Sequence, residues 1–252
     1  MRGNLWTREE EIIVFNLYCK IPFQYSSKNH PDVIKVANLI GRTPSAVNMK
    51  IGNFGSFDES LRKKGIVGLT NASKLDKQIW EEFNDSWDRL AFESEKILAR
   101  FQVQNSEESS VNPLGYNRLV LTKQRVNQSF FRKTVLVSYS NTCCITGLNN
   151  IQLLIASHIK PWAKSTDSEK TNPVNGLCLN ALHDKAFDMG LITITPDYKI
   201  RVSNRIKDVY NGEIVEKFFG CYHGKQIMMP EKFAPEKEFL MYHNKEMFER
   251  VV

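Results

Sequence analysis

Apolar residues recur at helical spacing through the first hundred residues of the chain. Thr7 and Glu10 form a capping-box pattern where the first of these stretches begins. A second helix is predicted over residues 31–40, because Gly41 is well placed to end it, and a third is predicted to begin at Pro44. The first part of the chain is therefore predicted to be helical.

A longer helix is predicted over Lys74–Arg100, where apolar residues again follow the helical period. The stretch 105–118 is polar, rich in turn-forming residues and poor in apolar ones, which is typical of a linker. We therefore predict a helical domain over residues 1–104, a linker over 105–118 and a second domain over 119–252.

The second domain combines a basic helix with short strands. The helix is predicted over residues 122–140, and β-like runs follow at Ile151–Ala156, Leu191–Thr195 and Lys199–Val202. The expected class is α+β, with a helical domain first and a mixed domain second.

Composition indicates an ordinary globular protein, with 42% hydrophobic and 25% charged residues. No apolar run is long enough for a membrane span, and the first residues lack the apolar core of a signal peptide, so a cytoplasmic location is expected. The five cysteines match neither a disulfide framework nor a paired C-x-x-C zinc pattern. They are expected to be reduced and mostly buried.

The distribution of charge is more informative than the net charge of +6. The stretch from Ser109 to Thr166 contains no acidic residue, yet it carries seven basic ones: Arg118, Lys123, Arg125, Arg132, Lys133, Lys160 and Lys164. This pattern favours a polyanionic partner, because neutralised phosphates release counterions; a solvated basic face without function is the alternative.

The two predicted helices around Gly41 indicate a helix-turn-helix, the arrangement that places a second helix in the major groove of double-stranded DNA. Arg42, Asn48 and Lys50 are then candidates to contact phosphates or base edges, with Ser45 and Asn53 on the same side. A small structural three-helix unit is the alternative.

The chemistry-bearing motifs lie in the second domain. In chain order they are Cys144-Ile145-Thr146-Gly147, Ser157-His158-Ile159-Lys160-Pro161-Trp162, Asn175-Gly176-Leu177 and Leu182-His183-Asp184-Lys185-Ala186-Phe187-Asp188-Met189-Gly190. Together with the basic helix before them, they resemble the HNH (ββα-metal) domain of bacterial restriction-type endonucleases. The resemblance spans residues 122–200, and the first domain is similar, less specifically, to the region that often precedes such domains.

The resemblance implies a metal-dependent DNA endonuclease of restriction or phage-defence type. By position, His158 would be the general base, Asn175 would hold the hairpin and orient His158, and His183 would ligate the metal. One divalent ion per site is expected, Mg²⁺ or alternatively Mn²⁺. Arg125, Arg132 and Lys160 are candidates for phosphate contact.

Two positions depart from the family pattern. Ser157 stands where many HNH sites have an acidic metal ligand, so the metal shell is incomplete, and Asp184 and Asp188 are candidates to contribute. Gly147 stands where a second cysteine would complete a zinc-binding pair with Cys144, so no structural zinc is expected.

Two other functions are compatible with these residues. A non-catalytic DNA-binding regulator with a degenerate HNH fold would explain Ser157, and an RNA-directed or toxin nuclease could use the same chemistry. The predicted helix-turn-helix favours DNA over RNA. A homodimer would suit a two-fold DNA site, since one HNH centre cuts one strand, but no residue pattern decides this.

Overall fold

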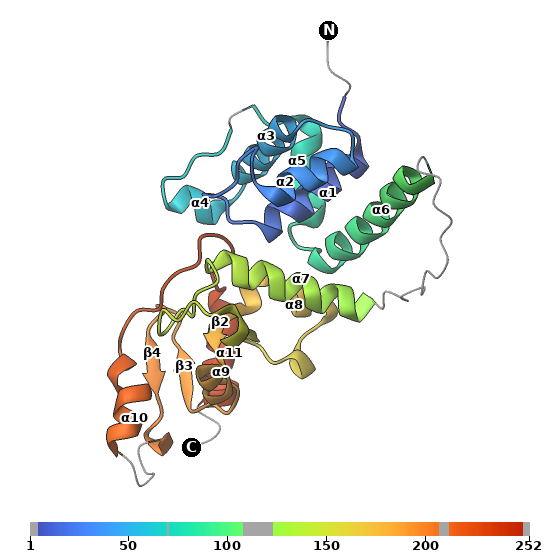
Figure 1. The fold of residues 1–252 in the computed structure, drawn as a ribbon. Coiled ribbons are helices and arrows are strands. Elements are labelled where there is room, and N and C mark those ends of the chain that lie inside the picture. Colours follow the sequence, from blue (N-terminus) through green and yellow to red (C-terminus); the bar gives the residue numbers. More distant parts are fainter. Residues whose placement is uncertain (1–4, 70, 108–122, 207–211, 249–252) are drawn as a thin grey trace. The chain divides into compact units, whose positions relative to one another are not determined.

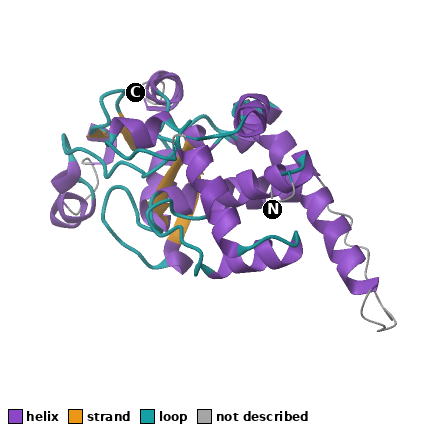
Figure 2. Cartoon of the chain, turned by 90° about the horizontal axis from the view of Figure 1, so that it is seen from above, coloured by secondary structure: helices purple, strands orange, loops and turns teal. Residues whose placement is uncertain are grey.

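The structure is a computed structural model that describes residues 5–69, 71–107, 123–206 and 212–248. The chain divides into two compact units, Met1–Phe130 and Phe131–Val252, here called unit 1 and unit 2 (Figure 1). Helices account for most of the described residues, and strands form two short antiparallel pairs (Figure 2). The expected mixture of helices and strands is confirmed.

Unit 1 is built from helices in its described part. They are α1 (Arg8–Lys20), α2 (Pro31–Leu39), α3 (Pro44–Gly55), α4 (Glu59–Lys63), α5 (Lys74–Phe83) and α6 (Trp87–Glu107). The predicted capping box is confirmed, because Thr7 and Glu10 each accept a hydrogen bond from the backbone N–H of the other. Gly41 follows α2 with a φ of 68°, a conformation that favours glycine.

The core of unit 1 forms around α1, which packs against α2, α3, α5 and α6. Phe15 and Tyr18 of α1 are fully buried, and the Phe15 ring stacks on Phe54 of α3 with 4.8 Å between centroids. Burying each such side chain contributes about 1.5–3 kcal/mol, so α1 is the centre of this unit.

The single helix expected over Lys74–Arg100 is wrong, because the chain forms α5 and α6 with a break at residues 84–86. Asn84 still donates its backbone N–H to Trp80, whereas Leu90 begins the next helical ladder by donating to the carbonyl of Ser86. Asn, Asp and Ser side chains compete with the backbone for hydrogen bonds and favour helix ends, which explains the break.

Unit 2 contains the strands. After α7 (Lys123–Ser138), whose first half belongs to unit 1, the ordered elements are β1 (Leu154–His158), α8 (Asp167–Thr171), β2 (Gly176–Asn180), α9 (Ala181–Asp188), β3 (Ile192–Ile194), β4 (Ile200–Val202), α10 (Gly212–Phe218) and α11 (Lys237–His243). Short 3₁₀ turns connect several of them, and a π-helical turn, Asn244–Phe248, follows α11. Strands β1 and β2 are antiparallel, as are β3 and β4.

The first strand begins three residues later than predicted and reaches His158. Residues Ile151–Leu153 form a 3₁₀ turn instead, because the Asn150 side chain accepts a hydrogen bond from Gln152 N at 3.1 Å. The predicted strands near residues 191–195 and 199–202 are present in shorter form, as β3 and β4.

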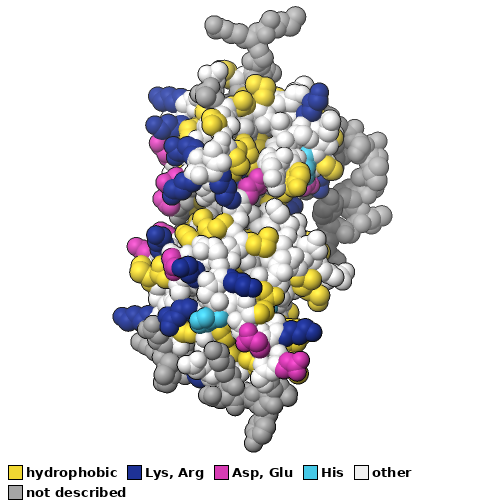
Figure 3. Space-filling view, turned by 90° about the vertical axis from the view of Figure 1, so that its left-hand side faces the viewer, with side chains coloured by type: hydrophobic (Ala, Val, Ile, Leu, Met, Phe, Trp, Pro, Cys, Tyr) yellow, Lys and Arg dark blue, Asp and Glu magenta, His cyan; other side chains and the backbone are white. Residues whose placement is uncertain are grey.

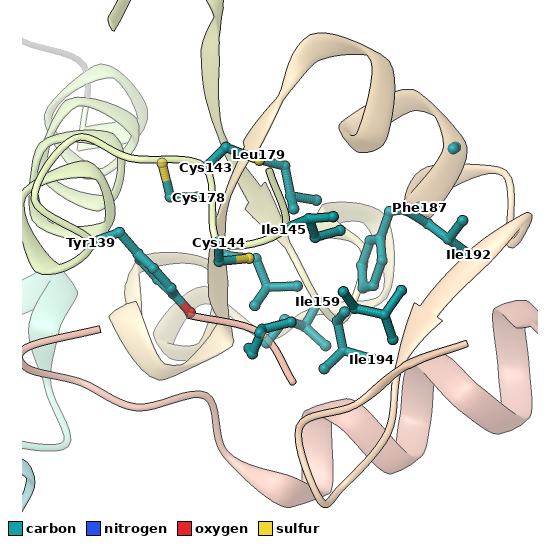
Figure 4. Packing of buried hydrophobic residues seen from close by; sticks show 14 of the residues in the cluster. Tyr139, Cys143, Cys144, Ile145, Ile159, Cys178, Leu179, Phe187, Ile192 and Ile194 are labelled. Atoms are coloured by element: carbon teal, nitrogen blue, oxygen red, sulfur yellow. The ribbon is translucent and has the colours of Figure 1, made fainter. Parts of the chain in front are cut away.

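An apolar cluster lies between these elements and fixes their arrangement (Figure 4). Phe187 from α9 lies near Ile192 and Ile194 of β3, and the thiols of Cys144 and Cys178 are buried in the same cluster. The described cysteines are free, and all but Cys221 are buried, as predicted. Burial raises the pKa of the Cys178 thiol to about 12, so it is protonated at neutral pH.

His243 joins α11 to this cluster. Its ring stacks on Phe187 with 3.6 Å between centroids, its Nε2 donates to the Phe187 carbonyl, and its Nδ1 accepts from the Thr193 hydroxyl. Burial lowers the pKa of His243 to about 4, so the ring is neutral and structural.

The expected domain boundary stays a prediction. Of the linker 105–118, residues 105–107 form the end of α6, and residues 108–118 lie outside the described part of the chain. The boundary between the two compact units falls within α7, between Phe130 and Phe131.

Candidate active site

The candidate site is built on the β1–β2 hairpin and on α9, which follows β2 directly. His158 ends β1 and pairs in register with Gly176, the first residue of β2. A side chain at position 176 would meet Val135 of α7, since a Cβ there would lie 2.4 Å from Val135 Cγ2. Glycine therefore allows α7 to approach the hairpin at the level of His158.

His158 is half-buried and held on three sides. Its ring stacks on Phe131 with 3.8 Å between centroids and meets Trp162 edge-on at 5.4 Å. Nε2 lies 2.9 Å from the carbonyl oxygen of Lys170. Because a carbonyl oxygen only accepts, Nε2 carries the hydrogen and Nδ1 of the neutral ring holds the free electron pair.

Burial lowers the pKa of His158, and the hydrogen bond to the Lys170 carbonyl opposes this effect in part. The net direction is downward, so the neutral ring predominates at cellular pH. A neutral histidine with a free Nδ1 pair can accept a proton, which is the chemistry of a general base.

Asn175 is fully buried and anchors the loop that follows β1. Its Oδ1 accepts from Lys160 N at 2.8 Å, and its Nδ2 lies 3.2 Å from Glu169 O and 3.4 Å from Lys160 O. The loop continues into α8, which supplies the Lys170 carbonyl that contacts His158. Asn175 therefore reaches His158 through the loop rather than by a direct bond.

His183 lies on α9 and is buried, with 2% of its surface exposed. Its Nε2 lies 3.0 Å from Phe218 O of α10, and its Nδ1 lies 3.0 Å from the Asn180 side-chain oxygen. The rings of Phe219 and Tyr222 also pack against it. Burial lowers the pKa of His183, so the ring is neutral and carries one N–H. Because the Phe218 carbonyl only accepts, Nε2 carries the hydrogen and Nδ1 keeps its electron pair.

These contacts reproduce a strand hairpin followed by a helix, with a histidine, an asparagine and a histidine in order. Residues 143–195 match the family model described as HNH endonuclease. This segment of the chain is similar to an HNH endonuclease domain. No curated protein matches the chain. The match covers the centre of unit 2 and indicates a nuclease that acts on nucleic acid.

No helix in the described ranges is long and apolar enough to cross a membrane.

Ser157 precedes His158 on β1. Ser157 is 3% exposed, and its hydroxyl oxygen has no hydrogen-bond partner that meets normal geometry. It is nevertheless close enough to stabilise the charged form of Asp184 on α9. Burial raises the pKa of Asp184 more than Ser157 and the neighbouring Lys185 lower it.

Asp188 lies one helical turn after Asp184 on the same face of α9. Burial raises the pKa of Asp188, and the negative charge of Asp184 raises it further. This coupling shows that the two carboxylates are close enough to repel each other.

The HNH family generally uses a divalent metal ion. Within the described ranges, no three His, Cys, Asp or Glu residues are grouped as a metal site. Mg²⁺, however, is commonly held by one or two carboxylates and completes its octahedron with water and substrate phosphate. Asp184 and Asp188 are carboxylates of this kind, and Nδ1 of the neutral His183 ring keeps an electron pair that a metal could take.

Lys160 of the HNH domain is engaged in an ion pair. Its Nζ lies 2.7 Å and 2.8 Å from the two carboxylate oxygens of Glu169, and the pair is largely buried. The expectation that Lys160 contacts phosphate stays a prediction, and it would require this ion pair to be shared with the phosphate or opened.

The cations predicted to contact DNA from unit 1 are also paired. Lys50 was expected on the exposed side of α3, but it is 6% exposed, and its Nζ lies 2.7 Å from Glu11 and 2.6 Å from Asp76. Its contact with DNA stays a prediction. Arg42 donates from Nε and Nη2 to the two oxygens of Glu10, at 2.9 Å each. These charges tie α1, α3 and α5 together.

The remaining candidates differ in exposure. Asn48 is half-buried and accepts a hydrogen bond from Ser26 at 2.7 Å. Arg125 and Arg132 lie exposed on α7, and Arg132 donates to the carbonyl of Leu154 at 3.0 Å. On the face shown in Figure 3, Lys and Arg side chains are interspersed with Asp and Glu rather than gathered in one basic patch.

Sequence reasoning missed Glu169 and the carbonyls of Lys170 and Phe218. A signal for Glu169 was present, because Thr166 and Glu169 form a capping box at the start of α8. The two carbonyls carry no side-chain signal, since any residue type supplies the same oxygen. Their roles depend on where the backbone of α8 and α10 lies.

Proposed function

We propose that the chain is a metal-dependent DNA endonuclease in which Nδ1 of His158 is the general base. The observation that carries this proposal is the 2.9 Å contact from His158 Nε2 to the Lys170 carbonyl, within a domain that matches the HNH endonuclease model. The contact fixes the hydrogen on Nε2 and leaves Nδ1 to take a proton from water.

In the proposed reaction, water loses a proton to Nδ1 of His158 as its oxygen forms a bond to phosphorus. The bond from phosphorus to the 3′-oxygen breaks, and this oxygen takes up a proton from solvent water, so that the products are a 5′-phosphate and a 3′-hydroxyl. A bound divalent cation supplies positive charge to the phosphate and to the leaving oxygen. Stacking on Phe131 and the Lys170 contact hold the imidazole in one orientation for this transfer.

Asn175 is the positioning residue in this proposal. It binds the 160–169 loop at both ends, through Lys160 and Glu169, and this loop leads into the Lys170 carbonyl. Loss of Asn175 would release the backbone that fixes the His158 tautomer. Its effect on cleavage is expected to be indirect but large.

We propose double-stranded DNA as the substrate and a role in restriction or phage defence. The short connection between α2 and α3, and the exposed side of α3 with Ser45, Asn48 and Met49, support contact with a major groove. Because Arg42 and Lys50 are paired internally, phosphate contacts would fall to other cations, such as the exposed Arg125 and Arg132 of α7.

The test is cleavage of supercoiled plasmid by the full chain with Mg²⁺ or Mn²⁺, on unmodified, methylated and hydroxymethylated DNA. Wild type is expected to nick or linearise at least one substrate, and His158→Ala is expected to bind DNA without cutting it. His223→Ala removes an exposed histidine outside the hairpin and is the matched control, which should cut normally.

Three outcomes would overturn parts of the proposal. Binding of every plasmid by wild type without any cutting would favour a non-catalytic regulator. Cleavage of RNA alone would exclude DNA as the substrate. Full activity of His158→Ala would exclude His158 as the base.

A further inference from the structure

Lys170 contributes two different groups to the surroundings of His158. Its backbone carbonyl oxygen lies 2.9 Å from Nε2 of His158. Its side-chain ammonium lies over the ring of Trp162, with 5.4 Å between Nζ and the ring centroid. The same indole meets the His158 imidazole edge-on, also with 5.4 Å between centroids. The ammonium and the imidazole are therefore neighbours of one ring, so a positive charge stands beside the proposed base.

Two interactions hold the Lys170 ammonium, and one of them is easily exchanged. Its Nζ lies 3.1 Å from an oxygen of Asp167, but the Asp167 side chain is 80% exposed. An exposed ion pair contributes little to stability, because water screens both charges, so another anion can take the place of Asp167. The cation–π contact with Trp162 does not depend on Asp167 and can keep the ammonium beside the ring during such an exchange.

Lys160, at the other end of the same loop, is held more firmly. Its Nζ contacts both carboxylate oxygens of Glu169, at 2.7 Å and 2.8 Å, and only 25% of the Glu169 side chain is exposed. Glu169 also accepts a hydrogen bond from the backbone N–H of Thr166 and thereby caps α8. A phosphate that recruited Lys160 would draw the cation away from this capping carboxylate, whereas one that recruited Lys170 would break an exposed ion pair.

The reaction proposed above brings a phosphate within reach of the Lys170 side chain. A water bound to Nδ1 of His158 lies about 3 Å from that nitrogen and attacks phosphorus from about 3–3.5 Å, so the phosphorus lies within about 7 Å of Nδ1. The non-bridging oxygens of the phosphate project outward from phosphorus. A lysine has a flexible four-carbon stem, and this one starts from the backbone that contacts His158, so its ammonium can reach such an oxygen.

We propose that the Lys170 ammonium binds a non-bridging oxygen of the phosphate that the water on His158 attacks. This proposal rests on the proposed endonuclease function and names a cation that contacts the substrate at its reacting phosphate. Lys170 then serves the reaction twice. Its carbonyl fixes the hydrogen on Nε2 of His158, and its ammonium stabilises the negative charge of the phosphate during attack. Asp167 occupies the ammonium until DNA binds, so the phosphate replaces one anion with another.

The first test measures DNA binding by the full chain with Lys170→Met. Methionine keeps the backbone carbonyl and most of the apolar stem, so the principal change is loss of the ammonium. Fluorescence anisotropy follows binding to a labelled duplex at several salt concentrations, in EDTA to prevent metal-dependent cutting. The duplex contains a site that wild type cuts, or has an arbitrary sequence if wild type cuts none.

The expected result is a weaker dependence of binding on salt. The slope of the logarithm of the binding constant against that of the salt concentration should become shallower by about one, because one phosphate contact is lost. Lys245→Met, which removes an exposed lysine that follows α11, is the control and should keep the wild-type slope.

The second test measures the cleavage rate with enzyme in excess, so that all DNA is bound. Lys170→Met is expected to cut at least about tenfold more slowly than wild type, because the contact is made to the reacting phosphate. Lys170→Arg keeps the positive charge and should cut within about threefold of wild type.

Asp167→Asn separates a phosphate contact from a structural role of the ion pair. This variant breaks the same ion pair as Lys170→Met but leaves the ammonium in place. It is therefore expected to bind DNA at least as tightly as wild type and to cut it at least as fast. If the ion pair only stabilised α8, both variants would lose activity to the same extent.

Circular dichroism and thermal unfolding show whether each variant folds. If Lys170→Met does not fold, acetylation of wild-type lysines by acetic anhydride replaces it, with and without bound DNA, and mass spectrometry reads the modified residues. DNA is expected to protect Lys170 and to leave Lys245 as reactive as before.

The proposal is overturned if Lys170→Met keeps the wild-type salt slope or the wild-type rate, if Lys170→Arg cuts as slowly as Lys170→Met, if Asp167→Asn loses as much activity as Lys170→Met, or if DNA leaves Lys170 reactive. Its failure is distinct from failure of the endonuclease. Cutting by Lys170→Met at the wild-type rate removes the contact and leaves the endonuclease. A shallower salt slope in Lys170→Met, with no cutting of any nucleic acid by wild type, removes the endonuclease and leaves a phosphate contact without the proposed reaction.

Discussion

Replacing Lys50 with methionine is expected to destabilise unit 1 rather than to weaken DNA binding selectively. Methionine retains much of the length and apolar character of lysine, so the principal change is loss of the ammonium. That group lies between Glu11 and Asp76, whose side chains are completely buried. Lys50→Met therefore leaves two carboxylates in the interior without their shared cation.

The magnitude follows from this burial. Removing one partner of a buried ion pair costs about 3–5 kcal/mol, because the other charge remains in the interior. Here two carboxylates remain, and one of them can take up a proton to limit the repulsion. We therefore expect a loss of about 3–5 kcal/mol near pH 7.5, a large part of the roughly 5–15 kcal/mol that stabilises a typical domain.

The loss should depend on pH with a definite sign. Burial raises the pKa of Glu11 to about 7, although the hydrogen bond from Lys50 opposes the rise. The folded state thus keeps this proton up to about pH 7, whereas the unfolded chain releases it near 4.5, so this group lowers stability as pH rises through that window. Without Lys50 the pKa rises further, and the penalty of the variant is smaller at pH 5 than at pH 7.5.

The assay is urea unfolding of the full chain at both pH values, followed by tryptophan fluorescence. Three of the four tryptophans, Trp6, Trp80 and Trp87, lie in unit 1 and Trp162 lies in unit 2, so the signal reports mainly on unit 1. Lys35→Met, which removes an exposed lysine of α2, is the control and should change stability by less than about 0.5 kcal/mol. A loss below about 1 kcal/mol at pH 7.5, or an equal loss at pH 5, would refute the role given to this buried pair.

Three further predictions concern unit 2. Gly176→Ala should destabilise unit 2 by about 1–3 kcal/mol, because the new Cβ would lie 2.4 Å from Val135. The control Gly212→Ala meets no atom within 4 Å and should be nearly neutral. Urea unfolding compares the stabilities of the two variants. Asn175→Ala should lower the cleavage rate at least about tenfold and destabilise unit 2 by about 1–3 kcal/mol, because Lys160 N loses its buried acceptor. Plasmid cleavage measures the first effect and thermal unfolding the second. Unchanged cleavage would contradict the positioning role. The cleavage rate should fall on the acid side with a midpoint below about pH 6.5, because burial lowers the pKa of His158 and the base must be neutral; a midpoint above this value would contradict the assignment.

Local rules predicted the beginnings of helices well. Thr7 with Glu10, and Pro44 after Thr43, fix helix starts through contacts within one turn, so their meaning can be read from neighbouring residues. The apolar period continues across residues 84–86, so it does not indicate the break between α5 and α6, which the Asn-Asp-Ser sequence there favours.

The fate of Lys50 could not be read in the same way. A lysine on a helix is exposed in most proteins, and the partners that bury this one lie 39 and 26 residues away in the chain. Tertiary contacts at such separations decide whether a charge faces DNA or ties helices together. Arg42, bound to Glu10 across 32 residues, is a second instance in the same unit.

The candidate site shows where motif reasoning succeeds and where it stops. The order of His158, Asn175 and His183 was sufficient to predict a hairpin and a helix, because the spacing of the motifs is set by the elements themselves. The metal ligands are a different matter, since successive positions on a helix point about 100° apart. On α9, His183 is buried against Phe218, Phe219 and Tyr222, whereas Asp188 is exposed.

The contacts of His183 have a consequence for chemistry. Because the Phe218 carbonyl only accepts, Nε2 of the neutral ring carries the hydrogen, and Nδ1 keeps an electron pair that faces the Asn180 side-chain oxygen. That oxygen already accepts from the His183 backbone N–H, so it keeps a partner when Nδ1 contacts another atom. The predicted role of His183 as a metal ligand therefore falls to Nδ1.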